Sequence, residues 1–312
     1  MNLRRLRYFV KIVDLGSLTQ AAEALHIAQP ALSQQLSTLE GEFNERLLIR
    51  TKRGVTPTPA GMVLYRHAQT ILRQLDQAHS DVGNAGQGLS GSVSVGLAPG
   101  TAASTLALPL LSAARTRYPG IILYLNENFG TTLSELIMTG RMDMAVLYGF
   151  HTLPGLEYHA LVDEALYLVG LPAVVGDADE VALADLYELD LLLPRGYNVV
   201  RKLVDAAFLQ AQRTPRVVAE IESLSTLSGA LVAGLGSTIL PSSTAHALAA
   251  AQPLALRRIV RPAIHAPLAL CTSSYLPLSA PAQAVKSIML ELVAAWPRGA
   301  GGTSPVPDPG QS

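Results

Sequence analysis

Apolar residues at the start of the chain recur at helical spacing and predict three short amphipathic helices within residues 1–43. Gly16 ends the first helix, and Ser17 can cap the second. Residues 26–28 form a turn, and Gln29-Pro30 opens the third helix. The predicted buried positions of the three helices are, in order, Leu3, Leu6, Phe9, Val10 and Val13, then Leu18, Ala21, Ala22 and Leu25, then Leu32, Leu36, Leu39 and Phe43. This pattern is typical of a helix-turn-helix.

The segment that follows, residues 47–58, predicts a small β-hairpin. Arg50, Lys52 and Arg53 crowd its tip, and Gly54 permits the turn. A basic hairpin directly after a helix-turn-helix is a wing. Residues 1–58 are therefore predicted to form a winged helix-turn-helix domain.

A long helix is predicted from Thr58 to about Val82. Its apolar seam repeats every 3.5 residues on average, the period of a coiled coil, and indicates dimerisation. The alternative is a helix that lies on its own domain. The seam consists of Leu64, Ala68, Ile71, Leu75, Ala78 and Val82. A glycine-rich hinge is expected at residues 83–91, so that linker helix and hinge together span residues 59–91.

Strand and helix patterns alternate over residues 92–295, which predicts a doubly wound α/β architecture in two lobes. The first lobe is expected to comprise residues 92–161 and 268–295, and the second residues 162–267. A strand is expected at Leu166–Leu171. Two such lobes make a hinged cleft at the carboxyl ends of their strands. Residues 296–312 are rich in glycine and proline and are predicted to be a disordered tail.

Composition and charge narrow the functional class. The chain has 312 residues, 49% of them hydrophobic, which excludes disorder over its whole length. The net charge of −1 is unevenly distributed, with +3 in residues 1–58 and −4 in the other 254 residues. A single cysteine, Cys271, excludes an intramolecular disulfide. Neither a signal peptide nor 18 consecutive apolar residues are found, so a soluble, cytoplasmic protein is expected.

The outer face of the third helix carries the side chains expected to read DNA in the major groove. Gln29 and Gln34 can each offer a donor and an acceptor to adenine, and Pro30 an apolar edge to a thymine methyl group. Basic wing residues would contact phosphates or the minor groove. Arg50 could instead pair with Glu40 or Glu42. The predicted DNA-binding set is Gln29, Pro30, Ser33, Gln34, Ser37, Arg50, Thr51, Lys52 and Arg53.

Several segments of the chain resemble LysR-type transcriptional regulators. They are Gly16-Ser17-Leu18-Thr19-Gln20-Ala21-Ala22, Ala28-Gln29-Pro30-Ala31-Leu32-Ser33-Gln34-Gln35-Leu36, Leu48-Ile49-Arg50-Thr51-Lys52-Arg53-Gly54 and Thr58-Pro59-Ala60-Gly61. The segments Tyr8-Phe9-Val10-Lys11-Ile12-Val13, Ala98-Pro99-Gly100-Thr101 and Glu220-Ile221-Glu222-Ser223 resemble the nitrogen assimilation control subgroup. Ala28 departs from the family pattern, in which many relatives have a capping serine, and Pro59 adds a second proline at the start of the linker helix.

The resemblance implies a periplasmic-binding-protein-like effector domain with a cleft between its lobes. The candidate effector-binding residues are Pro99, Gly100, Thr101, Ala102, Asn128, Phe129, Tyr148, Arg195, Tyr197 and Thr226. A helix N-terminus at residues 99–102 would suit a carboxylate. The resembling subgroup, however, is expected to act without a small-molecule coinducer. Two interpretations stay open: an empty cleft, or a ligand-responsive regulator of a catabolic operon.

Other functional classes find little support in the sequence. Gly86, Gly88 and Gly91 match GxGxxG, but they follow a helix and precede a strand, the wrong order for a nucleotide site. Catalytic motifs and metal-ligand spacing of the histidines are absent, so neither an enzyme nor a cofactor is expected. Residues 92–295 alone would suit a solute-binding protein. The resemblance instead implies a dimeric or tetrameric activator or repressor that binds duplex DNA at an interrupted inverted repeat and contacts RNA polymerase.

Overall fold

The computed structural model describes residues 2–51, 54–83, 88–98, 102–149 and 153–296. The chain forms two compact units, the first made of Met1–Gln87 with Met138–Arg141 and the second of Gly88–Ile137 with Met142–Ser312. None of the helices in the described ranges is both long enough and apolar enough to span a membrane.

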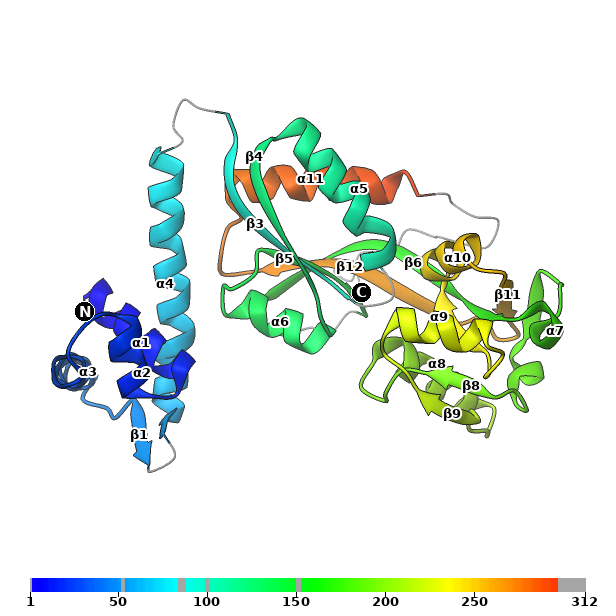
Figure 1. The fold of residues 1–312 in the computed structure, drawn as a ribbon, viewed down its shortest axis with the longest axis horizontal. Coiled ribbons are helices and arrows are strands. Elements are labelled where there is room, and N and C mark those ends of the chain that lie inside the picture. Colours follow the sequence, from blue (N-terminus) through cyan, green and yellow to red (C-terminus); the bar gives the residue numbers. More distant parts are fainter. Residues whose placement is uncertain (1, 52–53, 84–87, 99–101, 150–152, 297–312) are drawn as a thin grey trace, which may run out of the picture. The chain divides into compact units, whose positions relative to one another are not determined.

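The first unit is a helix-turn-helix followed by a hairpin and a long helix (Figure 1). Its elements are α1 (Leu3–Leu15), α2 (Leu18–Ala24), α3 (Gln29–Phe43), β1 (Leu48–Thr51), β2 (Gly54–Pro57) and α4 (Pro59–Gly83). The Ser17 side chain accepts a hydrogen bond from the Gln20 amide, 3.3 Å away, so the predicted cap of α2 is confirmed. Strands β1 and β2 pair in antiparallel fashion and form the predicted wing.

The inner faces of α1, α2 and α3 meet in one core. Most predicted positions lie in this core, and Ile12, which the prediction omitted, is fully buried. Two predicted positions are wrong, since Leu3 is 41% exposed and Phe43 is 43% exposed. These residues are the first of α1 and the last of α3, where the neighbouring helices no longer cover the side chain.

Helix α4 packs against α1 over its first turns. The Thr58 hydroxyl accepts from the Gly61 amide at 2.9 Å and donates to the Arg46 carbonyl at 2.7 Å, which ties the start of α4 to the wing. Leu64 and Ala68, predicted as part of the dimer seam, are buried in the core of their own unit. These two residues therefore pack as the alternative interpretation expects, and dimerisation along α4 stays a prediction.

The later seam residues are covered less. Ile71 and Leu75 are partly buried, whereas Ala78 and Val82 are exposed, Val82 to 77%. Near the start of α4, the apolar residues of the seam therefore pack inside the unit. Near the end of α4, they form an apolar surface that the unit itself does not cover.

The second unit is α/β with two lobes. Its strands are β3 (Ser90–Leu97), β4 (Gly120–Glu127), β5 (Met144–Tyr148), β6 (Leu156–Gly170), β7 (Glu180–Ala182), β8 (Leu191–Leu193), β9 (Val217–Glu220), β10 (Thr238–Pro241), β11 (Ala255–Val260) and β12 (His265–Ser273). Its helices are α5 (Ala102–Arg117), α6 (Gly130–Met138), α7 (Pro172–Val175), the 3-10 helix η1 (Leu183–Leu186), α8 (Val199–Gln210), α9 (Leu224–Val232), α10 (Ser242–Ala251) and α11 (Ala280–Ala294).

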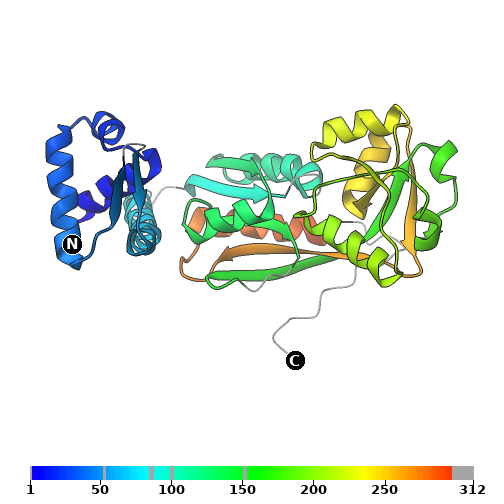
Figure 2. The same cartoon turned by 90° about the horizontal axis from the view of Figure 1, so that it is seen from below.

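Two long strands, β6 and β12, run side by side through both lobes (Figures 1 and 2). The main sheet has the order β4-β3-β5-β12-β6-β11-β7, and β10 also pairs with residues 166–169 of β6. Parallel strands β3, β4 and β5 build the first lobe, covered by α5 and α11 on one face and by α6 on the other. In the second lobe, β8 and β9 form a parallel pair.

The long strands correct the predicted architecture. A doubly wound sheet is parallel, but β12 is antiparallel to both β5 and β6, and β6 is antiparallel to β10 and β11. The strand predicted at Leu166–Leu171 begins ten residues earlier, at Leu156. Its first part carries the polar residues His159, Asp163 and Glu164, which weakened the apolar signal. Because both strands run continuously across residues 161–162 and 267–268, the exact division between the lobes stays a prediction.

Two predicted boundaries also differ from the structure. Ser90 and Gly91, predicted in the hinge, belong to β3, because they pair in register with Gly120 and Ile121 of β4. Trp296, predicted in the tail, packs against the main core. Residues 84–87 of the hinge and 297–312 of the tail lie outside the described residues.

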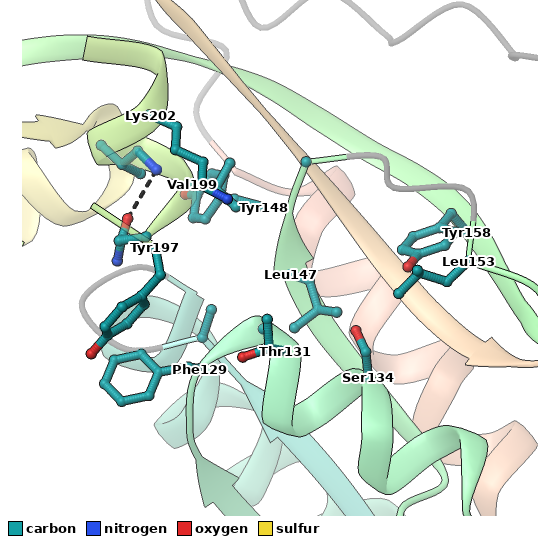
Figure 3. Close-up of a pocket in the computed structure, with 15 residues that line it drawn as sticks. Phe129, Thr131, Ser134, Leu147, Tyr148, Leu153, Tyr158, Tyr197, Val199 and Lys202 are labelled. Carbon is teal, nitrogen blue, oxygen red and sulfur yellow. Dashed lines mark hydrogen bonds between the residues drawn. The ribbon is translucent and has the colours of Figure 1, made fainter. Parts of the chain in front are cut away.

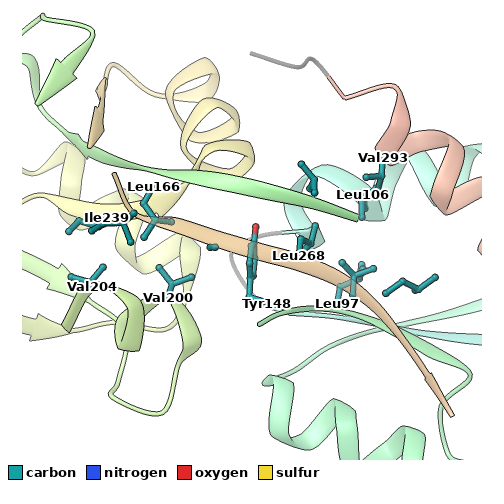
Figure 4. Packing of buried hydrophobic residues seen from close by; sticks show 14 of the residues in the cluster. Leu97, Leu106, Tyr148, Leu166, Val200, Val204, Ile239, Leu268 and Val293 are labelled. Atoms are coloured by element: carbon teal, nitrogen blue, oxygen red, sulfur yellow. The ribbon is translucent and has the colours of Figure 1, made fainter. Parts of the chain in front are cut away.

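One hydrophobic core continues from lobe to lobe (Figure 4). Leu97 and Leu106 contribute from the first lobe, Val204 and Ile239 from the second, and Leu268 of β12 lies between them. The overall prediction of a winged helix-turn-helix, a long linker helix and a two-lobed α/β domain is confirmed.

Candidate nucleic-acid interface and effector cleft

The outer face of α3 is polar and accessible. Gln29, Pro30, Gln34 and Ser37 are exposed, and Ser33 is half-buried. Ala28 stands at the N-cap and makes no side-chain hydrogen bond, while Pro30 occupies the first turn, where its missing N–H has no intrahelical partner to lose. The predicted base-reading side chains thus share one surface of one rigid helix.

Arg50 joins the wing to this surface. Its guanidinium Nη2 donates to the Ser33 hydroxyl across 3.1 Å. The alternative partners are engaged elsewhere, because Glu40 accepts the Leu47 and Leu48 amides at 2.9 and 3.2 Å, and Glu42 forms an ion pair with Arg5. Arg50 therefore lies beside the exposed polar face of α3.

Close backbone contacts hold the wing in place. The Val55 amide donates to the Gly16 carbonyl at 2.8 Å. A Cβ on Gly54 would lie 2.6 Å from that same oxygen, and a Cβ on Gly61 only 1.9 Å from the Leu47 carbonyl oxygen. Glycine is required at both positions because the wing packs directly on the turn after α1 and on the start of α4.

The tip of the wing is described only in part. Thr51 pairs with Gly54 in the hairpin, and its hydroxyl donates to the Gly54 carbonyl at 3.2 Å. Lys52 and Arg53 lie outside the described residues. Thr51 thus has a structural task in the turn in addition to its predicted contact with DNA.

The second unit contains a cavity of about 120 Å³ between its lobes (Figure 3). Aromatic and aliphatic side chains dominate the lining, with hydroxyl groups and one lysine among them. The lining residues are Ala98, Phe129, Gly130, Thr131, Ser134, Leu147, Tyr148, Gly149, Leu153, Tyr158, Tyr197, Asn198, Val199, Val200 and Lys202.

The structure brings together some of the predicted effector residues and not others. Phe129, Tyr148 and Tyr197 line the cavity, whereas Asn128, Arg195 and Thr226 do not. These three side chains make other contacts or face solvent. The Asn128 side-chain oxygen accepts a hydrogen bond from the Phe129 amide at 2.9 Å, and Arg195 Nε lies 3.5 Å from Glu220 Oε2. Thr226 is exposed on α9. Pro99, Gly100 and Thr101 lie outside the described residues, and Ala102 is the first residue of α5.

Several lining residues were missed by sequence reasoning. Thr131 and Ser134 come from α6, Leu153 and Tyr158 from the start of β6 and the segment before it, and Lys202 from α8. They are far apart in the chain and carry no shared motif. A signal existed only for lining residues next to a predicted one in the chain, namely Ala98, Gly130, Leu147, Gly149 and Asn198 among the described residues.

Two aromatic residues meet across the mouth of the cleft. Phe129 follows β4 in the first lobe and Tyr197 follows β8 in the second, and their ring centroids are 5.3 Å apart at an interplanar angle of 79°. The Tyr197 hydroxyl donates to Glu222, and this hydrogen bond raises the pKa of Tyr197. An edge-to-face pair of this kind stabilises contact between the lobes.

Tyr158 lines the cavity from the start of β6. Tyr158 of β6 lies across the strand pair from Cys271 of β12, and burial, followed by the effect of Cys271, raises the pKa of Tyr158 to about 12. In the described ranges no group of three or more His, Cys, Asp and Glu residues is arranged to hold a metal ion.

Two family models match the chain. A bacterial regulatory helix-turn-helix protein model of the lysR family covers residues 3–62, and a LysR substrate binding domain model covers residues 86–294. The chain belongs to the LysR family of transcriptional regulators. The resemblance seen in the sequence is thereby confirmed, and the two matches cover the winged unit and the two-lobed unit described above.

Two relatives named for nitrogen assimilation share about half of the sequence. The nitrogen assimilation regulatory protein nac of Klebsiella aerogenes is 52% identical over 293 residues, which are 94% of this chain and 95% of that protein. The protein of the same name from Escherichia coli K12 is 50% identical over 94% of this chain and 95% of its own length. The similarity to these two proteins therefore extends over almost the whole of each chain.

Solved structures share the full architecture. A full-length OxyR variant from Pseudomonas aeruginosa matches with a TM-score of 0.73 and 25% identity over 95% of each chain. Full-length CbnR complexed with its target DNA matches with a TM-score of 0.65 and 25% identity, over 94% of this chain and 99% of CbnR.

Proposed function

We propose that this LysR-type regulator binds duplex DNA through α3 and the β1–β2 wing and controls nitrogen-assimilation genes. The observation that carries the proposal is the Arg50–Ser33 hydrogen bond, which sets a cationic wing residue beside the amide side chains of α3. Gln29 and Gln34 would read base edges, with Ser33, Pro30 and Ser37 around them. Arg50, Thr51, Lys52 and Arg53 would contact phosphates or the minor groove. The DNA complex of CbnR supports DNA as the partner, and the nac relatives support the class of target gene.

The regulator would act as a dimer or tetramer at an interrupted inverted repeat. Leu64 and Ala68 are used inside their own unit, so the partner surface would begin at Ile71 and continue through Leu75, Ala78 and Val82. RNA polymerase is the further partner expected of an activator or repressor. The relatives are regulators, which supports a role without catalysis, in the cytoplasm where the DNA is.

A second candidate function is regulation by a carboxylate effector of a catabolic operon. It is favoured by Lys202 and by the first turn of α8, both at the cavity, because a cation and a helix N-terminus attract an anion. Calorimetry with a panel of small carboxylates tests this candidate. Measurable binding that Lys202→Ala weakens supports it. No heat, together with activation of transcription by the purified protein alone, refutes it.

Quantitative footprinting on the nitrogen-regulated promoters tests the main proposal. Wild-type protein is expected to protect two half-sites with strong preference over unrelated DNA. Gln29→Ala is expected to lose that preference, since one good amide–adenine pair is worth about 1–3 kcal/mol of discrimination. Gln74→Ala, at an exposed position of α4, is the matched control and should behave as wild type. Equal discrimination by wild type and Gln29→Ala would refute the assignment of α3 as the reading helix.

A further inference from the structure

Glu164 is a carboxylate buried at the junction of the two lobes. Its side chain belongs to β6, the strand that passes from one lobe to the other, and the residue is only 1% exposed. A buried charge is strongly unfavourable unless hydrogen bonds and dipoles replace its lost hydration. The groups that surround Glu164 therefore have to be held in place.

Donors from both lobes converge on this carboxylate. Oε1 accepts the Ser243 amide at 2.7 Å and the Ser242 hydroxyl at 3.0 Å, both from the first turn of α10 in the second lobe. Oε2 accepts the hydroxyl of Tyr148, the last residue of β5 in the first lobe. One carboxylate thus joins a strand end of one lobe to a helix start of the other.

Helix α10 depends on Glu164 for its cap. Pro241 stands at the N-cap and provides no side-chain hydrogen bond, so the free amide of Ser243 is satisfied by a residue almost 80 positions earlier in the chain. The helix dipole favours a negative charge at this end. Because α10 packs on both β6 and α5, its position also sets a contact between the lobes.

Tyr148 connects this network to the cleft. Its ring contributes to the cavity lining, while its hydroxyl points away toward β6, as Figure 4 shows. A change in the cavity that displaces the ring would withdraw a donor from the buried charge. Loss of a hydrogen bond to a charged group is worth about tenfold in a local opening equilibrium.

We propose that Tyr148 and Glu164 are a coupling pair that transmits the state of the cleft wall to α10 and so to the arrangement of the lobes. Neither residue needs to contact a ligand or DNA. When the Tyr148 ring is in place, its hydroxyl stays hydrogen-bonded to Glu164. The first turn of α10 then keeps its hydrogen bonds to Glu164, and the lobes keep the arrangement of this structure. When the ring moves, the first turn of α10 opens. The regulatory consequence rests on the proposed function, since only a DNA-binding protein converts lobe arrangement into control.

Hydrogen exchange of the full-length protein, read by mass spectrometry, tests the pair without DNA. Tyr148→Phe keeps the ring and removes the hydroxyl, and exchange in peptides covering residues 242–247 is expected to become about tenfold faster. Tyr197→Phe is the matched control, because its hydroxyl lies in the same cleft but bonds the surface residue Glu222. It should leave residues 242–247 at the wild-type rate.

The reverse experiment uses a milder variant in the other lobe. Ser242→Ala removes one donor and leaves the Ser243 amide, and it should speed exchange at residues 144–149 at the end of β5, since coupling between two sites is reciprocal. A merely structural role would lower the melting temperature without this transfer between lobes. Unchanged exchange in residues 242–247 of Tyr148→Phe, or in 144–149 of Ser242→Ala, overturns the proposal.

DNA footprints then distinguish a failure of the proposed function from a failure of the coupling pair. If wild type protects no promoter fragment, the proposed function fails while the exchange result still decides the coupling pair. If wild type binds, Tyr148→Phe is expected to keep its affinity for a half-site and to change the length of the protected region. An unaltered footprint alongside faster exchange would overturn the link from α10 to lobe arrangement.

Discussion

The two units of this protein place their functional surfaces in opposite relation to their cores. In the winged unit, the core lies on one side of α3, and the residues proposed to read DNA lie on the other side, in solvent. In the two-lobed unit, the cavity interrupts a core that continues from lobe to lobe, and Tyr148 belongs to both. Binding and stability can be changed separately in the first unit, but they are linked in the second.

The polar contacts of the two units follow the same division. Glu40 and Thr58 bind backbone groups of the adjoining wing and linker, so they fix local geometry. Glu164 binds groups from both lobes, so it fixes the relation between distant elements.

The largest effect is expected from Leu36→Ala in the winged unit. Leu36 is buried on the inner face of α3, and truncation of a buried leucine costs about 2–5 kcal/mol of unfolding free energy. Denaturant unfolding should show loss of the first unit, with loss of DNA binding as a consequence. Gln34→Ala, two residues away on the exposed face, should leave the unfolding midpoint unchanged. A midpoint shift in Gln34→Ala as large as in Leu36→Ala would break the separation of binding from stability.

Thiol labelling gives an independent probe of the second unit. Cys271 is fully buried, and burial raises its pKa to about 12. At pH 8 the thiolate fraction should be about a thousandfold smaller than that of a thiol with a pKa near 9. Labelling of native protein should be slow by at least this factor relative to protein in denaturant. Leu36→Ala should not accelerate it, whereas Leu268→Ala, in the strand that carries Cys271, should.

A smaller effect, on the order of one unit in the salt slope, is expected from the wing. Arg53→Ala should weaken binding to all DNA and lower the slope of log affinity against log salt by about one. Arg50→Ala should do the same and should also reduce discrimination between sequences, because Arg50 positions Ser33. Gel shifts at several salt concentrations measure both quantities. Equal discrimination in Arg50→Ala and Arg53→Ala would contradict the positioning role of Arg50.

The smallest effect is expected at alkaline pH, in both units. Burial and the hydrogen bond to Asp14 raise the pKa of Tyr65 to about 12, and burial and Cys271 do the same for Tyr158. A raised pKa means that folding favours the neutral phenol, so this stability is complete below pH 10 and is lost between pH 10 and about 12. Tyr65→Phe should flatten the pH dependence of the first unit, and Tyr158→Phe that of the second. Flattening of both by either variant would show that the units unfold together.

Much of the winged unit could be predicted because its signals are local. A helical period of three to four residues places Leu32, Leu36 and Leu39 inside and the glutamines outside, whatever the rest of the chain does. The same periodicity could not show that Leu64 and Ala68 pack on α1 and not on a second chain, since both environments accept the same apolar side chain. The pattern on α4 correctly predicted that Leu64 and Ala68 are buried, but it did not identify the element that buries them.

The lining of the cleft, in contrast, could not be predicted from local signals. Thr131, Tyr158 and Lys202 have no spacing in common, and they become neighbours only because β6 and β12 bring the lobes together. Arg195 follows β8 and Thr226 lies on α9, but neither side chain lines the cavity. Backbone periodicity reports which side of an element faces a core, and it carries no information about which distant element lies opposite.

The order of residues was therefore sufficient to predict the family. It was also sufficient for the helix-turn-helix, the wing and the polar outer face of α3, which depend on contacts within a short stretch of the chain. Folding in three dimensions alone decided that two antiparallel strands traverse both lobes, which side chains enclose the cavity, and that Glu164 caps a helix almost 80 residues away. The physical reason is that a buried charge must find its donors wherever the fold supplies them, and no local pattern specifies where that is.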